Sequence, residues 1–450
     1  SIEIPASITS IGMRAFNRCY LTEIRSYATT PPTIGSEDYF PTFEYELTVP
    51  ITVYVPAGSE EAYRSANGWS KFQNIVPMEA EKKELEVGDT FTADGITYKV
   101  TDADLKEVQV GDGDNPAIDA SSTTISIPSS VIGSDDKAYT VKCIGKEAFY
   151  RCENLATISI PSTVTSIGDS AFGECKSLSS IDIPNSVVSI GETAFAECNS
   201  LTKLEIGNSL TTLGAGAFQY CENLNSVIIG NNISVIDDYA FLMCPNLTSV
   251  VLGSSVTSIG TEAFAYCKKL AGVDIPNSVA FIGKQAFRQC ESLSYVTFGN
   301  ALTTISEYAF YNCPTLSSIS IPSTVTTIEE GAFGLCKGLK EVTSLIEEPF
   351  AVTNCWSFIE TNTILLYVPA GTKKRYQATE GWKDFANILE IGVANLEPFE
   401  SDKTVDTKNL KDESLTNNVV GGIYYNLGAD GYDATDGSIV ISEVTSMAKI

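Results

Sequence analysis

Residues 183–201 read Ile-Pro-Asn-Ser-Val-Val-Ser-Ile-Gly-Glu-Thr-Ala-Phe-Ala-Glu-Cys-Asn-Ser-Leu, and the pattern of this stretch recurs along the chain. Its Ala-Phe-x-x-Cys centre occurs nine times without an insertion, because successive phenylalanines are always 23 residues apart. The nine residues are Phe149, Phe172, Phe195, Phe218, Phe241, Phe264, Phe287, Phe310 and Phe333. A constant period of about 20 to 50 residues is the sequence signature of solenoids and related repeat architectures.

The repeat unit contains two strand signals. Around Ile158 and Ile160 apolar residues alternate with polar ones, which predicts a strand whose Thr157 and Ser159 face outward. The short β-branched stretch 164–167 predicts a second strand, on another wall of the molecule.

The rest of the unit predicts a turn and a stacked core. Ala171, Phe172 and Cys175 recur at the spacing of a helical turn, and Gly168 fits the bend before it. One unit cannot bury these side chains alone, but units stacked about 4.8 Å apart place identical side chains in ladders. The sequence therefore predicts a right-handed solenoid of short parallel strands with a short helical turn in each repeat.

A cysteine follows each repeat phenylalanine by three residues, from Cys152 to Cys336, and Cys19 follows Phe16 in the same way. Stacked Cα atoms about 5 Å apart are within disulfide range. However, ladder side chains point in the same direction, whereas zinc requires convergent ligands. Since cysteine is small and often fully buried, we expect free thiols and no bound metal. A bridge between Cys143 and Cys152 is the remaining alternative.

Composition excludes several classes of function. The formal net charge of −27 repels phosphate backbones and anionic membrane surfaces, so we expect no nucleic acid partner. No apolar run approaches the roughly 20 residues of a membrane span. The chain has no histidine, which removes the usual general base and the commonest metal ligand. We therefore expect no enzyme activity and no cofactor.

Two similar strings outside the repeats indicate capping modules. Tyr-Val-Pro-Ala-Gly occurs at 54–58 and at 367–371, and Gly-Trp follows at 68–69 and at 381–382, always with an offset of 313. A solenoid must cover its end faces with segments that break the repeat. The aromatic residues of these strings are therefore predicted to form lids.

These features divide the chain into six expected segments. Residues 79–140 hold 14 acidic and 5 basic residues, with strand signals near Phe91, Ile96 and Val108. The expected segments are the last repeat and cap of a preceding domain (1–78), an N-terminal cap (79–140), the nine-repeat solenoid (141–339), a C-terminal cap (340–391), a linker (392–420) and the start of a truncated β module (421–450).

The consensus Ile-Pro-x-Ser-Val-x-x-Ile-Gly-x-x-Ala-Phe-x-x-Cys-x-x-Leu resembles the BspA-like leucine-rich-repeat family of bacterial surface proteins. It is seen most fully at 183–201 and 275–293, and the repeats cover 142–342. The resemblance implies a leucine-rich-repeat-like solenoid in an exported, often lipid-anchored protein, so we expect an extracellular or cell-surface location. It also implies that some members act as adhesins, and it supplies no catalytic residue to carry over.

Candidate binding residues lie at the outward positions of the first strand. An apolar stripe of Ile228, Val251 and Tyr295 is expected within a field of serine, threonine and charged residues, and exposed apolar patches can mark interaction sites. Variable surface filling is the competing interpretation. The candidates are Asp182, Lys203, Glu205, Ile228, Val251, Asp274 and Tyr295.

Three further features of the sequence each allow a functional and a structural interpretation. A second aromatic set, Tyr150, Tyr220, Tyr266 and Tyr311, fits either an interface or packing between repeats. Asp182 and Glu205 on adjacent repeats form a glycosidase-like pair, but an open wall lacks the pocket that would raise one pKa. The acidic runs at 112–115 and 430–436 could supply calcium ligands, although polar turns explain them equally.

The sequence therefore favours a surface-exposed, adhesin-like protein that binds a host or bacterial surface protein through its solenoid wall. Basic partners are favoured by the charge. Glycan capture with Tyr295 as a stacking platform is a second hypothesis, and a structural spacer without its own ligand is a third.

Overall fold

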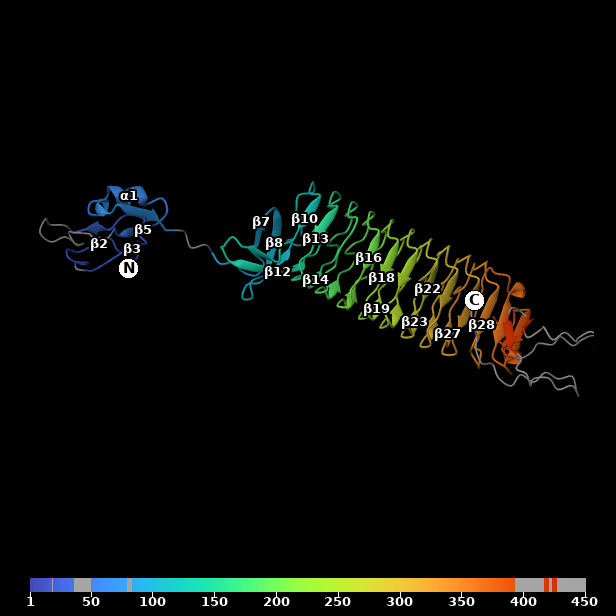
Figure 1. Cartoon of the computed structure of the whole chain (residues 1–450). Helices are drawn as coiled ribbons and strands as arrows, with labels where there is room; N and C mark the ends of the chain where they lie inside the picture. Colours follow the sequence, from blue (N-terminus) through green and yellow to red (C-terminus); the bar gives the residue numbers. More distant parts are fainter. Residues whose placement is uncertain (18, 36–49, 79–82, 393–416, 421–422, 427–450) are drawn as a thin grey trace, which may run out of the picture. The chain divides into compact units, whose positions relative to one another are not determined.

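The computed structural model describes residues 1–17, 19–35, 50–78, 83–392, 417–420 and 423–426. Figure 1 shows the stacked turns of the repeat region in sequence order. Most of the expected linker and of the expected β module, including the acidic run 430–436, lies outside the described residues. Within them, β31 (Asn417–Val420) and β32 (Ile423–Asn426) pair in antiparallel fashion.

The first predicted strand is confirmed and forms one wall of the solenoid, which we call the strand wall. From residue 203 onward, residues 23 apart are opposite one another where neighbouring strands pair in parallel, for example Leu204 and Val227. The pairing is interrupted between 249–251 and 272–274 and between 295–297 and 318–321. The strands are β10 (Thr124–Ser126), β13 (Thr157–Ser159), β16 (Lys203–Glu205), β18 (Ser226–Ile228), β20 (Ser249–Val251), β22 (Gly272–Asp274), β24 (Tyr295–Thr297) and β26 (Ser318–Ile321). Thr157 and Ser159 are exposed and Ile158 is buried, as the alternation requires.

The second predicted strand is also confirmed, on a separate wall. These strands are two residues long, and their second residue is buried in every repeat. They are β14 (Ser166–Ile167), β15 (Ser189–Ile190), β17 (Thr212–Leu213), β19 (Val235–Ile236), β21 (Ser258–Ile259), β23 (Phe281–Ile282), β25 (Thr304–Ile305) and β27 (Thr327–Ile328).

The segment expected as a helical turn is in detail a run of tight hydrogen-bonded turns. Within it the Cys175 amide donates to the Phe172 carbonyl, three residues back. The Phe172 amide instead donates to the Ala194 carbonyl of the next turn, at 2.7 Å. Residues two before and two after the phenylalanine, such as Ser170 and Glu174, have φ of 50° and 58°. This left-handed conformation prevents a continuous helix and turns the backbone toward the neighbouring repeat.

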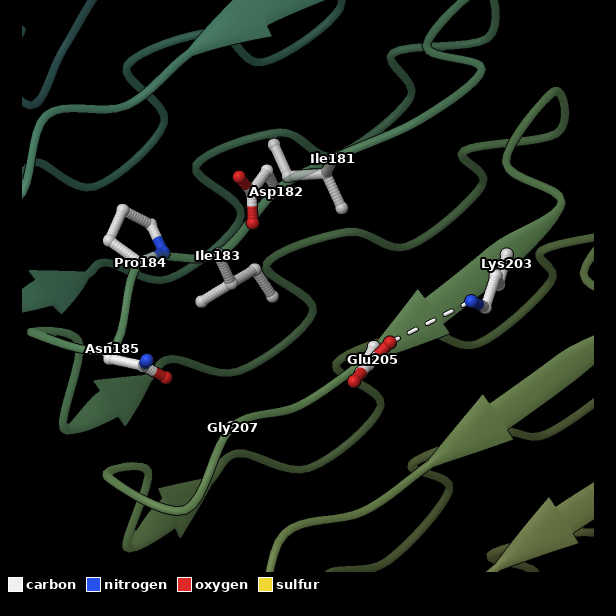
Figure 2. A pocket seen from close by; sticks show the side chains of 8 residues that line it. All are labelled: Ile181, Asp182, Ile183, Pro184, Asn185, Lys203, Glu205 and Gly207. Atoms are coloured by element: carbon white, nitrogen blue, oxygen red, sulfur yellow. Dashed lines mark ion pairs between the residues drawn. The ribbon is translucent and has the colours of Figure 1, made fainter.

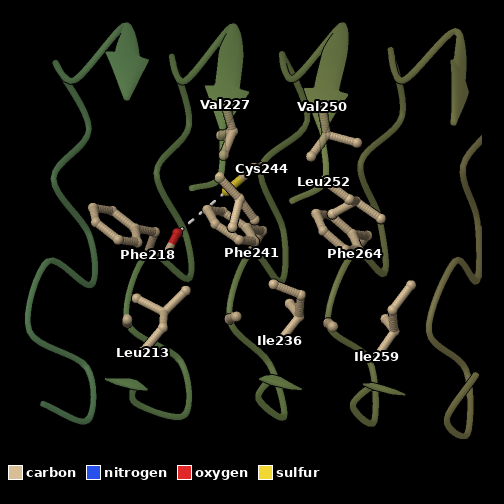
Figure 3. Close-up of a cluster of buried hydrophobic side chains, with 14 of the residues drawn as sticks. Leu213, Phe218, Val227, Ile236, Phe241, Cys244, Val250, Leu252, Ile259 and Phe264 are labelled. Carbon is tan, nitrogen blue, oxygen red and sulfur yellow. Dashed lines mark hydrogen bonds between the residues drawn. The ribbon is translucent and has the colours of Figure 1, made fainter. Parts of the chain in front are cut away.

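The phenylalanine ladder is the centre of the core, as predicted. All nine rings are fully buried, and neighbouring rings are nearly parallel with centroids 4.9 to 5.7 Å apart. Figure 3 shows Phe218, Phe241 and Phe264 stacked along the solenoid with aliphatic side chains above and below. Each ring therefore fills space for two neighbouring turns as well as its own.

The cysteine ladder runs beside the phenylalanines, and all twelve cysteines of the chain are free thiols. From Cys175 onward each ladder sulfur lies 3.1 to 3.4 Å from the phenylalanine carbonyl of the preceding turn, as Cys244 does toward Phe218 in Figure 3. Burial raises the pKa of the Cys198 thiol well above its ordinary value. Cys19 differs from the ladder, because its side chain is exposed.

The N-terminal end of the solenoid is covered by strands that the sequence located correctly. They are β7 (Thr90–Ala93), β8 (Ile96–Asp102) and β9 (Glu107–Val110), which pair in antiparallel order. Strand β12 (Ala138–Ile144) then pairs in parallel with β9 and with β14, while β11 (Ser130–Ile132) lies along β12. The antiparallel strands thus end the parallel wall.

The C-terminal end contains a tenth ladder position that the sequence analysis missed. Trp356 stacks on Phe333 at 5.3 Å and 16°, and Cys355 takes the place of the alanine before the ring. Trp356 also lies 23 residues after Phe333, which was the available signal. The cap continues through β28 (Glu341–Ser344), η2 (Thr361–Thr363), β29 (Leu365–Val368), α2 (Lys373–Ala378) and β30 (Asn387–Glu390).

The two similar strings make matching contacts. Tyr376 donates to the Ile346 carbonyl at 2.7 Å, and Tyr63, 313 residues earlier, donates to the Ala28 carbonyl at 2.7 Å. Trp69 and its counterpart Trp382 are both fully buried. The first string belongs to a separate hydrophobic cluster, which spans residues 4–75. Its elements are β1 (Ile2–Ile4), β2 (Ser10–Ile11), β3 (Glu23–Ser26), β4 (Thr33–Ile34), β5 (Thr52–Val55), α1 (Glu60–Ser65), η1 (Trp69–Lys71) and β6 (Asn74–Pro77).

Candidate functional site

The strand wall presents two columns of outward side chains. One column passes from Lys203 through Ser226 to Ser249, and the other passes from Glu205 through Ile228 to Val251. The columns continue on β22 and β24, where Gly272 is opposite Tyr295 and Asp274 is opposite Thr297. All seven candidate residues are exposed on this wall.

The structure brings three of the candidates together around one hollow of about 550 Å³. Asp182, Lys203 and Glu205 line it, and Lys203 Nζ lies 3.7 Å from Glu205 Oε2 (Figure 2). The hollow coincides with a break in the wall, because among the described residues no backbone hydrogen bond joins 180–182 to its flanking strands. The exposed ion pair contributes little to stability, so these side chains are available to a partner.

Ile228 and Val251 form an apolar pair next to this hollow. They are directly opposite one another on β18 and β20, and 39% and 56% of their surface is exposed. On the far side, Thr297 Oγ1 donates to Asp274 Oδ1 at 2.6 Å. The pair is therefore an exposed apolar spot framed by carboxylates, which is the arrangement of many small interfaces.

Tyr295 does not continue the expected apolar stripe, and this expectation is corrected. Val251 belongs to the same column as Asp274, whereas Tyr295 belongs to the other column, opposite Gly272. Its ring lies over Gly272, where any side chain would collide with it. Tyr295 thus covers bare backbone and still exposes 48% of its surface.

The wall has no enclosed site for acid–base chemistry in its described part. The carboxylates of Asp182 and Glu205 line an open hollow and are both exposed. The acidic run at 112–115 forms a polar turn in which Asp112 Oδ1 accepts from the amides of Asp114 and Asn115. These hydrogen bonds lower the pKa of Asp112.

Positive charge is absent from the central repeats. Between Lys203 and Lys268 the chain has no lysine or arginine. It has five acidic residues there, namely Glu205, Glu222, Asp237, Asp238 and Glu262. The apolar pair of the wall lies in this segment.

A second exposed strip, which we call the turn edge, follows the left-handed positions beside the phenylalanine ladder. Of the second aromatic set, Tyr150 bonds to Glu174, and Arg288 lies over the rings of Tyr266 and Tyr311 at 5.7 and 6.0 Å. These three tyrosines therefore pack between repeats, whereas Tyr220 is exposed.

Two neighbours of Tyr220 on the turn edge, Tyr239 and Met243, were not predicted from the sequence. They occupy the positions two before and two after Phe241. Tyr220, Tyr239 and Met243 each expose 37 to 39% of their surface. Glycine at 216 and 331, the positions equivalent to Tyr239, was the available signal that this position has positive φ.

Within the described residues, no group of three acidic or cysteine side chains is arranged to hold a metal ion. No helix in the same part of the chain combines the length and the hydropathy of a bilayer span.

A sequence profile described as the BspA type leucine rich repeat region matches the chain in six copies, at residues 1–40, 142–271 and 257–374. The matched residues make up more than half of the chain. No curated protein matches it significantly.

Solved structures of bacterial repeat proteins are similar to the chain. A leucine rich cell surface protein of Faecalibacterium prausnitzii is 21% identical over 68% of this chain and 95% of its own, with a TM-score of 0.36. The pneumococcal vaccine antigen PcpA is 18% identical over 69% and 100%, with a TM-score of 0.36. A leucine-rich repeat protein of Bacteroides ovatus is 23% identical over 67% and 99%, with a TM-score of 0.32.

Proposed function

Because this chain belongs to the BspA-type leucine-rich-repeat family, we propose that it is an adhesin-like protein of the bacterial surface that binds a protein partner through its strand wall. The observation that carries the proposal is the apolar pair Ile228 and Val251 beside the hollow at Asp182 and Glu205. The fold needs no apolar residue at these outward positions, since the equivalent residues Ser159 and Ser320 are polar.

The partner is expected to be a protein with a basic surface. Five carboxylates and no cation lie between Lys203 and Lys268, and the whole chain carries −27. A shallow wall suits a broad contact in which a few apolar residues supply most of the affinity. Complementary charge at the rim would increase the rate of association and make it depend on salt.

The double variant Ile228→Ser, Val251→Ser is expected to weaken retention of the partner at least tenfold, about 1.4 kcal/mol. Removing two exposed methyl-rich side chains deletes the apolar centre without touching the core. Purified matrix proteins and whole bacterial cells are tested for retention at low and at high salt.

Val235→Ser is the matched control, because Val235 is similarly exposed at 42% but lies on the other wall, in β19. Wild-type protein that retains nothing at either salt concentration, or a double variant that binds like the wild type, would contradict the proposal.

Tyr295 supports a second candidate function, glycan capture. Its half-exposed ring lies flat over Gly272 beside the bonded pair Asp274 and Thr297, so that a stacking face adjoins hydrogen-bonding groups. Tyr295→Ala is expected to abolish sugar signals on a glycan array if this function holds, whereas Phe281→Ala, which removes an exposed ring of the other wall, should leave them unchanged. A structural spacer would show neither protein retention nor sugar signals.

A further inference from the structure

We propose that the turn edge carries a second docking surface, distinct from the strand wall, for a basic segment of a protein that also bears apolar side chains. The surface is centred on Tyr220, Tyr239 and Met243, which we call the turn-edge patch.

The three residues of the patch are neighbours in adjacent turns. The Tyr220 amide donates to the Leu242 carbonyl at 2.7 Å, which places Tyr220 beside the turn that holds Met243. The Leu242 amide donates in turn to the Tyr239 carbonyl at 2.9 Å, and Leu242 itself is buried. Two exposed tyrosines and an exposed methionine on hydrogen-bonded turns give this edge the composition typical of interfaces.

The fold does not require large side chains at these positions. Tyr220, Tyr239 and Met243 have φ of 60°, 61° and 54°, a region that is costly for residues with a Cβ atom. Glycine occupies the position of Tyr239 in two other repeats, as Gly216 and Gly331 with φ of 61° and 62°. The position that Tyr220 and Met243 share holds polar residues in other repeats, for example Glu174 and Asn312. The backbone of the repeat therefore does not require large apolar side chains at these three exposed positions.

The negative charge near the patch favours a partner segment with basic side chains. The patch lies in the segment that has five carboxylates and no lysine or arginine. Glu222 follows Tyr220 in the same turn, and Glu262 belongs to the next turn after Met243. Next to the patch, Gly173 and Ala196 leave a hollow of about 180 Å³ whose lining includes Glu197. Glu197 acts on Lys176 by its charge, but the Lys176 ammonium pairs with Glu153 at 2.6 Å. Among the described residues, no ion pair within 4.0 Å and no hydrogen bond engages the Glu197 side chain, so a cationic group of the partner can pair with it.

The occupant is thus expected to place arginine or lysine beside Glu197 and aromatic or aliphatic side chains on the patch. A purely cationic segment would lack the apolar contact, and a purely apolar segment would leave the carboxylates unpaired.

The test uses the full chain and three synthetic twelve-residue probes, one of alternating arginine and leucine, one with serine in place of leucine and one with glutamate in place of arginine. The triple variant Tyr220→Gly, Tyr239→Gly, Met243→Gly should keep the wild-type melting temperature within a few degrees, because glycine suits the positive φ. It should bind the arginine–leucine probe at least tenfold more weakly in fluorescence anisotropy at 50 mM salt. Wild type should prefer this probe at least tenfold over the other two.

Two controls separate this surface from the strand wall. The double variant Ile228→Ser, Val251→Ser should bind the arginine–leucine probe like wild type, whereas Glu197→Gln should weaken it severalfold and reduce the salt dependence. Equal binding of the probe by wild type and the triple glycine variant, or no preference for leucine over serine, would overturn the inference whatever the outcome for the wall.

Discussion

Phe241→Ala is expected to lower the free energy of unfolding by about 3 to 5 kcal/mol, the usual cost of truncating a fully buried phenylalanine. The Phe241 ring is completely buried between Phe218 and Phe264, with ring centroids 5.7 and 5.3 Å away. A cavity at this site removes contacts from three consecutive turns, and loss of one turn divides the stack into two shorter arrays. Thermal and denaturant unfolding measure the effect.

Phe16→Ala is the matched comparison. Phe16 follows the same Ala-Phe-x-x-Cys pattern, but its side chain is only half-buried and it packs against a separate cluster. Its substitution should therefore have a clearly smaller effect on the melting of the repeat region. Small and equal shifts for both variants would show that the phenylalanine ladder is not the core.

Alkaline pH is expected to unfold the repeat region cooperatively, beginning near pH 9. Burial raises the pKa of the Cys152 thiol from 9.0 to about 11, and it raises the pKa of Cys198 and Cys244 well above 9.0. Because these pKa values are raised in the folded state, their stabilisation is complete below pH 9. It is lost as the pH rises toward the folded-state values, since only the unfolded thiols ionise.

The size of this effect depends on how many buried thiols become exposed when neighbouring turns unfold together. Each buried thiol costs about 1.4 kcal/mol of unfolding free energy per pH unit above its unfolded pKa, so three adjacent turns lose about 4 kcal/mol per unit. Circular dichroism melts between pH 8 and 11 should show a steep fall of the melting temperature.

The triple variant Cys198→Ala, Cys221→Ala, Cys244→Ala tests the cause, because it removes three titrating groups from the centre of the ladder. Whatever its stability at pH 7, its melting temperature should fall less steeply with pH than that of the wild type. Iodoacetamide at pH 8 should modify the exposed Cys19 while leaving the ladder thiols intact. A melting temperature that stays constant from pH 8 to 10.5 would contradict this prediction.

The repeat period was sufficient to predict both walls, the stacked core and the outward residues. A 23-residue period places each side chain opposite its equivalent in the next turn, as Ile228 and Val251 show. The hydrophobic alternation around Ile158 then decides which side chains are buried, because a strand side chain has only two faces to choose between.

The candidate site was predicted less completely. All seven residues proved exposed, but the sequence did not separate Tyr295 from the column of Val251, since both looked like outward strand residues. It also passed over Tyr239 and Met243, because a helical turn was expected where the backbone makes left-handed turns.

The sequence by itself determined that this protein is a stack of equivalent turns with a phenylalanine and cysteine interior. Each turn of a solenoid core is built from the same pattern of apolar residues, and this pattern can be recognised in every repeat. Only the tertiary structure decided where the pairing of the strand wall is interrupted, as at 180–182, that Tyr295 covers Gly272 and that Trp356 continues the ladder. Backbone pairing and ring packing between turns depend on the exact fit of neighbouring side chains, and no single repeat contains that information.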